Sequence, residues 1–239
     1  MQLENQVAIV TGSSRGIGKA IALALAKEGC NIVITSRTPN EIKETAKEIR
    51  ELGVDTLEVK ADVGNSNDVK NLVGKTVKNF GRVDILVNNA GILIKKPLVK
   101  MTEKEWDTLI SINLKGAFLF SKEVLPYMTK QGNGVIVNIS SGAGKHGYAT
   151  LSAYCGSKFG LIGLTESLAQ EVKKSHIKVY AVCPGMVATK MQYDIIGAAT
   201  YKLTKGLMIK PEKIAKKVLE LCLSNCKVPT GSSIEIYYP

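Results

Sequence analysis

Tyr154 and Lys158 are the two side chains whose types and spacing point most directly to acid–base chemistry. They stand four residues apart in a segment with helical spacing, so both side chains project from one face of a helix. A phenol has an ordinary pKa of about 10 and is a poor base near neutrality. A neighbouring ammonium group favours the phenolate and makes the phenol a usable acid or base. Taken alone the pair is weak evidence, because Tyr and Lys also occur at this spacing as exposed helix residues.

A glycine-rich turn follows the first apolar segment and precedes a segment with helical spacing. Glycines allow a sharp turn and a close approach of the backbone to a pyrophosphate, and the start of the next helix offers free N–H groups. The spacing is Gly-x3-Gly-x-Gly, and the commoner form is Gly-x-Gly-x-x-Gly. Its position between strand and helix predicts a dinucleotide site formed by Gly12, Ser14, Arg15, Gly16, Ile17 and Gly18.

The end of the second apolar segment distinguishes between the two nicotinamide dinucleotides. An acidic residue there binds the ribose 2′-hydroxyl of NAD, whereas an arginine accommodates the 2′-phosphate of NADP. The segment ends in Ser36 and Arg37 with no acid, and Arg15 can reach the same phosphate from the glycine turn. The sequence therefore predicts NADP(H) as the cofactor. The alternative for Arg37 is a solvated cation on a loop.

Short apolar segments alternate with longer amphipathic ones along the whole chain. Most of the short segments are continuously apolar, as strands covered on both faces must be. Alternation of strand and helix predicts an α/β fold of the Rossmann type, with one doubly wound parallel sheet of about seven strands and helices on both faces. The expected strands are 7–10, 32–34, 57–59, 83–87, 135–139, 179–182 and 234–236, and a helix is expected to begin near Pro211.

The composition is that of an ordinary globular protein, with 45% apolar and 22% charged residues among 239. We find no linker or repeat, which favours a single domain over residues 1–239, with residues 186–210 as an irregular substrate flap. No apolar run reaches the roughly 20 residues of a membrane span, and the first residues do not resemble a signal peptide. We expect a cytoplasmic protein without membrane partners.

The net charge of +11 allows nucleic acid, a membrane surface or anionic small molecules as partners. No motif that reads nucleic acid and no cluster of aromatic residues is present, which argues against nucleic acid. Residues 190–217 contain seven lysines and only two acidic residues, which leaves a local excess of positive charge.

The five cysteines are scattered, so we expect reduced thiols and no metal site. Cys222 and Cys226, at helical spacing, are expected to pack in the core.

At this point the chain resembles the short-chain dehydrogenase/reductase family, and in particular its 3-oxoacyl-(acyl-carrier-protein) reductases. The resemblance runs from about residue 5 to about residue 235 and combines several motifs in the family's order. Ser141 stands 13 residues before Tyr154, as in the family. The matching segments are Thr11 to Gly18, Asp62-Val63, Asn88-Asn89-Ala90-Gly91, Asn113, Ser140-Ser141, Tyr154-x-x-x-Lys158 and Pro184-Gly185.

The resemblance implies a role for each matching residue. Tyr154 would exchange the proton, Ser141 would hydrogen-bond the substrate oxygen, Lys158 would also hold the nicotinamide ribose, and Asn113 would anchor a water that passes protons to Lys158. Without the family spacing, Ser141 could merely end a strand and Asn113 could cap a turn. Further cofactor contacts are implied for Asp62 and Val63 at the adenine, Asn89 at the adenosine ribose, and Val187 and Thr189 at the nicotinamide amide or phosphate.

The leading hypothesis is an NADPH-dependent reductase of a ketone or aldehyde, with Tyr154 as the proton donor. The substrate pocket is expected to include residues 92–97, 142–151 and 186–208. Their lysines suggest an anionic or carrier-linked substrate such as a 3-oxoacyl thioester, although solubility explains the charge equally well. The alternatives are a small-molecule carbonyl reductase, a sugar or alcohol dehydrogenase, and a non-catalytic NADP-binding regulator. The resemblance also implies a homo-oligomer, a tetramer or a dimer, although the C-terminal segment departs from the family pattern.

Overall fold

The computed structural model describes residues 1–238, except for the side chain of Pro39. One sheet of seven strands runs through the molecule in the order β3-β2-β1-β4-β5-β6-β7, and all neighbouring strands are parallel. The predicted α/β class and parallel sheet are confirmed. The strands are β1 (Val7–Thr11), β2 (Asn31–Ser36), β3 (Thr56–Lys60), β4 (Ile85–Asn88), β5 (Gly134–Ile139), β6 (Ile177–Pro184) and β7 (Ser233–Ile236).

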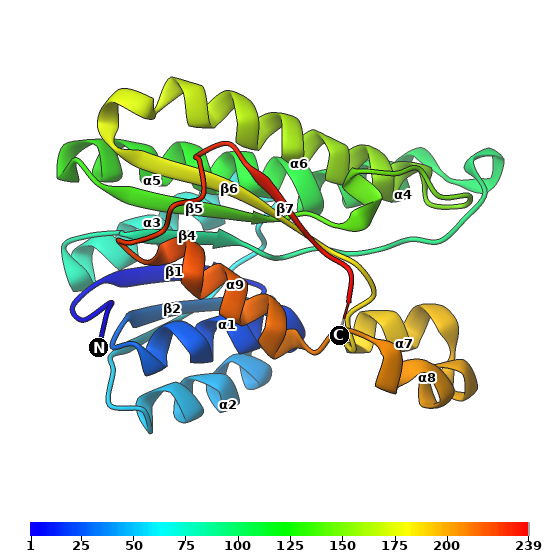
Figure 1. Cartoon of the computed structure of the whole chain (residues 1–239), viewed down its shortest axis with the longest axis horizontal. Coiled ribbons are helices and arrows are strands. Elements are labelled where there is room, and N and C mark those ends of the chain that lie inside the picture. Colours follow the sequence, from blue (N-terminus) through cyan, green and yellow to red (C-terminus); the bar gives the residue numbers. More distant parts are fainter. Residues whose placement is uncertain (239) are drawn as a thin grey trace.

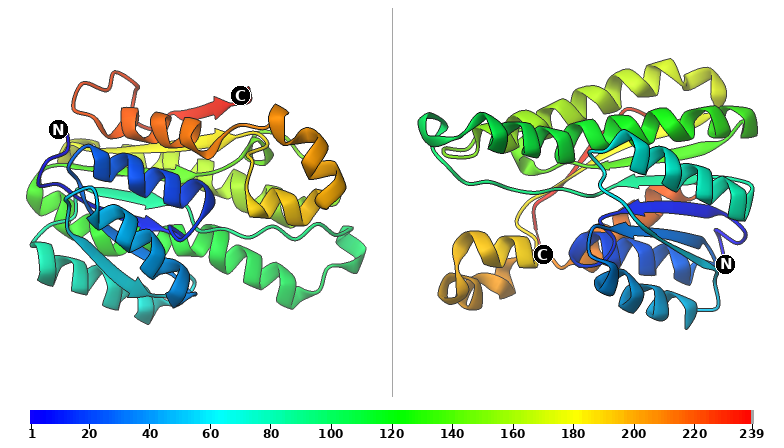
Figure 2. Two further views of the ribbon diagram at one scale, coloured as in Figure 1. Left: turned by 90° about the horizontal axis from the view of Figure 1, so that it is seen from below. Right: turned by 180° about the vertical axis from the view of Figure 1, so that it is seen from behind.

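Nine α-helices are found in the described part of the chain, and most of them cover the two faces of the sheet (Figures 1 and 2). On one face α1, α2 and α9 pack against alternate strand residues, and on the other face α3, α5 and the end of α6 do so. The helices are α1 (Gly16–Lys27), α2 (Pro39–Arg50), α3 (Ser66–Phe80), α4 (Glu103–Ile110), α5 (Gly116–Gln131), α6 (Ser152–Glu171), α7 (Lys190–Ile196), α8 (Ala198–Thr204) and α9 (Pro211–Cys222).

The central strands are apolar because both of their faces are covered. Every residue of β1, β4 and β5 is buried, which explains why these segments show no alternation of polar and apolar residues. A chain of buried amides holds β4, β5 and α6 together: Asn88 Nδ2 donates to Asn138 Oδ1 at 2.9 Å, and Asn138 Nδ2 donates to Thr165 Oγ1 at 2.8 Å. These hydrogen bonds join β4 and β5 to each other and to α6 near the carboxyl ends of the two strands.

The segment 186–210, predicted as a flap, contains α7 and α8 and projects past the ends of the strands (Figures 1 and 2). Neither short helix has a buried residue. The flap therefore lies beside the edge of the sheet at which the parallel strands have their carboxyl ends.

Two details differ from the expectations. β4 begins at Ile85, two residues later than expected, and the Asp84 carboxylate just before it accepts a hydrogen bond from Val7 N at 2.9 Å. Helix α9 ends at Cys222, so Cys226 does not share a helix face with it. Cys226 instead contacts Tyr180, whose hydroxyl lies 3.9 Å from its sulfur. No helix within residues 1–238 is long and apolar enough to cross a membrane.

Candidate active site and dinucleotide pocket

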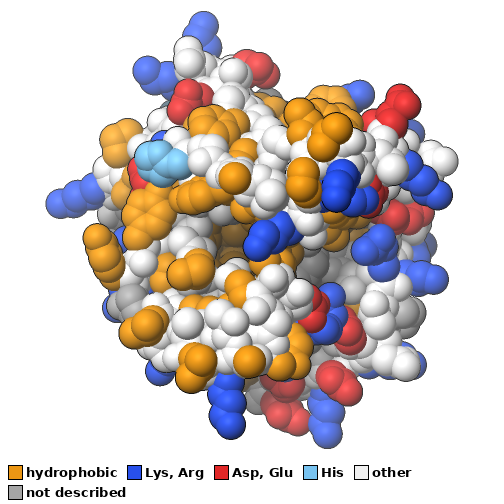
Figure 3. All heavy atoms as spheres, turned by 90° about the vertical axis from the view of Figure 1, so that its right-hand side faces the viewer, with side chains coloured by type: hydrophobic (Ala, Val, Ile, Leu, Met, Phe, Trp, Pro, Cys, Tyr) orange, Lys and Arg blue, Asp and Glu red, His pale blue; other side chains and the backbone are white. Residues whose placement is uncertain are grey.

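A cavity of about 750 Å³ opens at the carboxyl ends of the strands. Ligands of open α/β sheets bind at this edge, where the strand order changes direction between β1 and β4. Figure 3 looks onto it and shows a hollow with hydrophobic and basic side chains at its rim. The predicted site residues that line the cavity are Gly12, Ser14, Arg15, Gly16, Ile17, Ser36, Arg37, Asp62, Val63, Asn89, Tyr154, Lys158 and Thr189.

The three glycines of the turn meet two different requirements. Gly12 and Gly16 have φ values of 62° and 57°, in the left-handed region that side chains rarely adopt. Gly18 lies behind the turn and outside the cavity, where a Cβ would come within 2.4 Å of the Gly12 carbonyl oxygen. The first two glycines therefore shape the turn, and the third allows α1 to pack against it.

Thr11 and Asn89 join the ends of β1 and β4. The Thr11 hydroxyl accepts from the backbone N–H groups of Asn89 and Ala90 at 2.9 and 3.0 Å. Asn89 Nδ2 donates to the carbonyl oxygens of Thr11 and Gly12 at 2.8 and 3.1 Å. The Asn89 side chain thus holds the glycine turn in place, in addition to lining the cavity.

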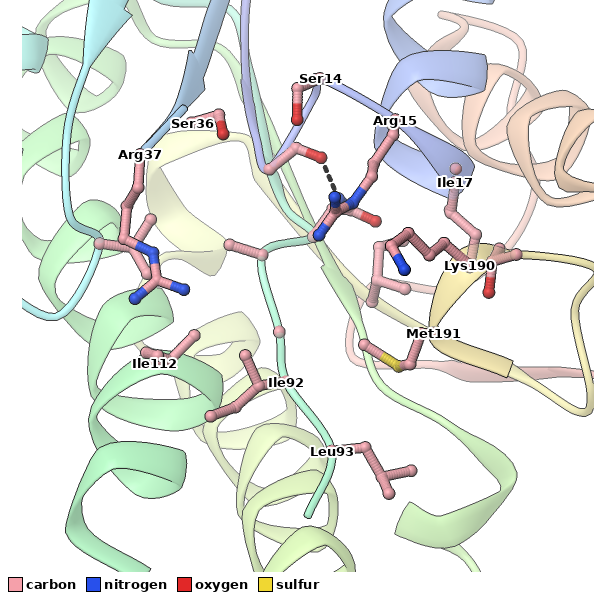
Figure 4. Close-up of a pocket in the computed structure, with 18 of the residues that line it drawn as sticks. Ser14, Arg15, Ile17, Ser36, Arg37, Ile92, Leu93, Ile112, Lys190 and Met191 are labelled. Atoms are coloured by element: carbon pink, nitrogen blue, oxygen red, sulfur yellow. Dashed lines mark hydrogen bonds between the residues drawn. The ribbon is translucent and has the colours of Figure 1, made fainter. Parts of the chain in front are cut away.

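One end of the cavity carries the residues predicted to distinguish NADP from NAD. Figure 4 shows Ser14 and Arg15 on one side and Ser36 and Arg37 on the other. A carboxylate that the sequence analysis missed also lines this end: Glu41 accepts from Ser14 Oγ at 2.9 Å and from Arg15 Nη1 at 3.2 Å. It comes from the first turn of α2, four residues beyond Arg37, and only the direction of that helix brings it to the cavity.

Asp62 and Val63 follow β3 and form another wall of the cavity. The Asp62 carboxylate accepts from the Gly64 backbone N–H at 2.9 Å, and the Asp62 N–H donates to Asp68 at 2.9 Å. Val63 is buried and contacts Gly116 closely enough that a Cβ there would lie 3.1 Å from it. The turn after β3 is therefore held rigidly against the cavity.

Tyr154 and Lys158 lie on the buried face of α6, with exposures of 8% and 4%. The Lys158 ammonium donates to the Ile139 carbonyl oxygen at 2.8 Å and lies 5.6 Å from the centre of the Tyr154 ring. Burial lowers the pKa of Lys158 to about 8. Burial raises the pKa of Tyr154, and this outweighs a hydrogen bond with Ser141 that lowers it.

The direction of the Tyr154 pKa shift is opposite to the expected one. The expectation counted the neighbouring ammonium, but no lowering by Lys158 is found. Lys158 directs its ammonium to the Ile139 carbonyl, and the phenol is enclosed by protein. Burial therefore favours the protonated phenol of Tyr154 near neutrality.

Ser140 and Ser141 follow β5 and face different partners. Ser140 is buried and donates to the Lys158 carbonyl oxygen at 2.9 Å, which ties the end of β5 to α6. Ser141 accepts from the Ala143 N–H at 3.1 Å, and its hydroxyl is close enough to Tyr154 to lower the pKa of the phenol. Although Ser141 is not part of the cavity lining, it is the serine in contact with the candidate acid.

Asn113 lies in a π-helical turn, Ser111–Lys115, between α4 and α5. Such turns are rare and often occur at functional sites. Its side chain is buried and pairs with both backbone groups of Ile92, at 2.8 and 2.9 Å, and with Ser157 at 3.1 Å. A Cβ on Gly91 would lie 3.4 Å from Asn113 Oδ1 and 3.7 Å from Lys158 Nζ. Asn113 and Lys158 thus face the same space, which Gly91 leaves unfilled.

The flap forms the wall opposite the glycine turn. Thr189 caps α7 by accepting from the Gln192 N–H at 3.4 Å, and Val187 is buried and pairs with Ile209, outside the cavity lining. Lys190, Met191, Asp194 and Ile195 also line the cavity, as do Ile92, Leu93 and Lys95 from the segment after β4.

The remaining expected substrate segment, 142–151, contributes no residue to the cavity lining in the described part of the chain. Instead, the ring of Tyr237 covers Gly142 and Gly185, and a Cβ on either glycine would lie within 3.1 or 3.2 Å of that ring. The segment after β7 therefore packs on the two loops that carry Ser141 and Val187.

Several of the lysines suggested for anion binding already have acidic partners. Lys96 pairs with Glu105 at 2.6 Å, and this contact lowers the pKa of Glu105 to about 2. Lys190 pairs with Asp194 at 2.9 Å, and Lys217 pairs with Glu220. The positive charge near the flap is consequently smaller than the count of lysines indicates.

Comparison with known proteins agrees with this geometry. The family model described as short chain dehydrogenase matches residues 6–198. A 3-oxoacyl-(acyl-carrier-protein) reductase of Thermotoga maritima is 37% identical over 99% of this chain and 98% of its own length. A protein of the same name from Staphylococcus epidermidis is 36% identical over 97% of both chains.

Two solved structures have the same fold. A protein from Sinorhizobium meliloti described as a short-chain alcohol dehydrogenase superposes with a TM-score of 0.91 at 32% identity, over 98% of this chain and 95% of that one. Levodione reductase superposes with the same TM-score at 28% identity, over 98% and 96%. The predicted resemblance is confirmed: the chain belongs to the short-chain dehydrogenase family of oxidoreductases, which act on alcohol and carbonyl groups.

Proposed function

We propose that this protein is an NADPH-dependent reductase that converts a ketone or aldehyde to an alcohol. The observation that carries the proposal is the buried pair of Tyr154 and Lys158, with the half-buried Ser141 next to Tyr154, beside a cavity of about 750 Å³. When bound, NADPH supplies the hydride for the carbonyl carbon, and the protein must supply one proton to the carbonyl oxygen. None of the four candidate catalytic residues is missing from the sequence, which argues against a non-catalytic regulator.

Tyr154 is the group suited to supply that proton. Burial keeps its phenol protonated near neutrality, and the Ser141 hydroxyl lies beside it. A carbonyl oxygen placed against both hydroxyls would receive hydrogen bonds that strengthen as negative charge develops on it. Lys158, charged below about pH 8, would stabilise the phenolate that remains.

Asn113 is proposed to act through Lys158. Its side chain is occupied by Ile92 and Ser157, so it cannot reach the ammonium directly. The space that Gly91 leaves between the two groups has polar atoms on both sides, as a bridging water requires. A water there would return a proton to Tyr154 by way of Lys158.

The dinucleotide is proposed to extend across the cavity, with its 2′-phosphate at Arg15 and Arg37 and its nicotinamide at Tyr154. The glycine turn, with Gly12, Ser14, Gly16 and Ile17, would hold the pyrophosphate, and Gly18 would support the turn from behind. Asp62, Val63 and Asn89 would contact the adenosine, and Ser36 would flank the phosphate. Val187 and Thr189 would contact the nicotinamide side, on which Lys158 would hold the ribose.

Reversal of the charge at Arg37 tests the cofactor. Arg37→Asp should weaken NADPH binding at least about tenfold and leave NADH binding equal or tighter, because a 2′-phosphate loses a charge-assisted partner. Fluorescence titration of each dinucleotide measures both affinities without a substrate. Lys78→Asp, an equal charge change on the exposed end of α3, is the control. Unchanged NADPH affinity in Arg37→Asp would refute the assignment.

For the substrate we propose a 3-oxoacyl thioester carried by an acidic carrier protein. The names of the relatives from Thermotoga maritima and Staphylococcus epidermidis support it, as do exposed lysines near the cavity mouth. Lys95 lines the cavity, and the exposed lysines of segment 186–210 are Lys202, Lys205 and Lys210. Lys130, Lys173 and Lys174 directly precede β5 and β6, so they lie at the opposite edge of the parallel sheet and are not part of this surface. A small carbonyl substrate is the second candidate, favoured by the structural similarity to levodione reductase.

Ionic strength distinguishes the two substrates. With a carrier-linked 3-oxoacyl group, kcat/KM should fall several-fold between about 20 and 500 mM salt, since screening weakens attraction between exposed charges. The same acyl group on a small neutral thiol serves as the control and should show little change. A carrier-linked substrate whose kcat/KM does not depend on salt would rule out electrostatic docking.

The protein is also proposed to work as a homo-oligomer in the cytoplasm, as one domain with residues 186–210 as its flap. Large apolar side chains on α4, α5 and α6 are exposed: Trp106, Phe118, Tyr127 and Phe159. Such a cluster is typical of a surface that pairs with another copy. All five cysteines are free thiols, which fits a reducing compartment.

A further inference from the structure

We infer that Glu41 is a specificity-determining residue that competes with the 2′-phosphate of NADPH for Arg15 and Ser14. This inference rests on the proposed use of NADPH. The end of β2 itself has no acidic residue. The inference is that Glu41, from α2, directly affects the choice between NADPH and NADH.

The position of Glu41 is fixed by contacts on both sides. Its carboxylate accepts from Ser14 Oγ at 2.9 Å and from Arg15 Nη1 at 3.2 Å. Thr45, one helical turn further along α2, donates to the carbonyl oxygens of Ser14 and Glu41 at 3.2 and 3.3 Å. The start of α2 is thereby held against the glycine turn, and the Glu41 carboxylate stands at the wall of the cavity.

A ribose 2′-phosphate would need the same donors. Arg15 and Ser14 offer a cation and a hydroxyl toward the end of the cavity that Arg37 closes from the other side (Figure 4). Within residues 1–238, Arg37 has no ion-pair partner, whereas Arg15 is paired with Glu41. One of the two predicted phosphate ligands is therefore occupied by an internal anion.

The two dinucleotides meet this carboxylate differently. The phosphate of NADPH is an anion, so it must displace the Glu41 carboxylate from Arg15 or bind beside a like charge. The ribose of NADH has a hydroxyl there, and this hydroxyl can donate a hydrogen bond to a carboxylate. Glu41 therefore lowers the preference for NADPH over NADH that Arg15 and Arg37 create.

The ion pair itself contributes little to folding. The Arg15 and Glu41 side chains are 61% and 36% exposed, and exposed pairs of this kind are weak. Removal of the Glu41 charge is thus expected to leave the fold intact and to act on the cofactor.

Glu41→Gln keeps the size of the side chain and removes its charge. We expect it to tighten binding of NADPH and of 2′,5′-ADP by about fivefold, because Arg15 is then free to pair with the phosphate. Binding of NADH and of 5′-AMP should stay equal or weaken. Glu44→Gln, the same change at an exposed position of α2 outside the cavity, should alter none of these affinities. Fluorescence titration and calorimetry measure them without turnover.

A second measurement separates competition from a structural effect. In the Arg15→Ala background, Glu41→Gln should change NADPH affinity far less, because the contested cation is absent. If Glu41→Gln and Glu41→Ala both leave the ratio of NADPH to NADH affinity as in the wild type, Glu41 does not set specificity. If the wild-type protein binds neither dinucleotide, the proposed function fails, and this inference fails with it.

Discussion

Replacement of Tyr154 by Phe should lower kcat by about two to four orders of magnitude, the usual contribution of a positioned proton donor. The ring still fills its buried place on α6, so the Kd for NADPH should stay within about twofold of the wild-type value. The cause is the loss of one proton at the carbonyl oxygen, and Ser141 cannot supply it because its ordinary hydroxyl pKa is far too high. Single-turnover measurement with NADPH and a carbonyl substrate isolates this step.

The control for this variant is Tyr238→Phe, which removes a hydroxyl from a side chain that is 80% exposed. It should be as active as the wild type. Wild-type turnover by Tyr154→Phe would overturn the mechanism, whereas loss of NADPH binding would show that the phenol acts on the cofactor and not on the substrate.

Replacement of Lys158 by Met should have two opposite consequences. Turnover should fall by at least about a hundredfold and NADPH should bind more weakly, because the ammonium proposed to stabilise the phenolate and to hold the nicotinamide ribose is lost. The folded protein should nevertheless become more stable near pH 7. The difference between the ordinary Lys pKa of 10.5 and about 8 corresponds to roughly 3 kcal/mol of unfavourable burial, offset by about 1 kcal/mol for the hydrogen bond to Ile139.

The stability gain has a defined pH dependence. The pKa of Lys158 is lower in the folded than in the unfolded protein. Burial of this side chain therefore costs no stability above pH 10.5, where it is neutral in both states, and the cost grows to its full size as pH falls through about 8. The advantage of Lys158→Met should therefore be full below about pH 8 and shrink as pH rises toward 10.5. Urea unfolding at pH 7 and pH 9.5 measures it. Lys174→Met, at an exposed position, should show no such trend, and a less stable Lys158→Met at pH 7 would contradict the burial argument.

The parts of the fold and site that depend on local pattern could be predicted from the sequence. Continuous apolar runs located the strands, because strands covered on both faces cannot alternate. The glycine turn and the Tyr154–Lys158 pair could be placed because their spacing fixes their geometry within one turn and one helix. Ser141 was preferred over Ser140 on spacing, and the structure gives it the contact with Tyr154.

The parts that depend on tertiary packing could not be predicted. Glu41 reaches Arg15 only because α2 folds back against the glycine turn. The sign of the Tyr154 pKa shift depends on enclosure of the ring, which no spacing reveals. Segment 142–151 is absent from the cavity wall, and its first glycine lies against Tyr237, which is distant in sequence. Each case involves residues brought together from separate elements.

The cavity exists only after distant parts of the chain have met. Asn89 and Thr11, whose hydrogen bonds close its floor, are 78 residues apart, and β1 and β4 pair only across that distance. Such long-range pairing forms late in folding because a large loop must close first. A dinucleotide that binds there recognises the native state alone, so it should slow unfolding without speeding refolding. In a cell, the lifetime of this enzyme would then rise and fall with the supply of its own reductant.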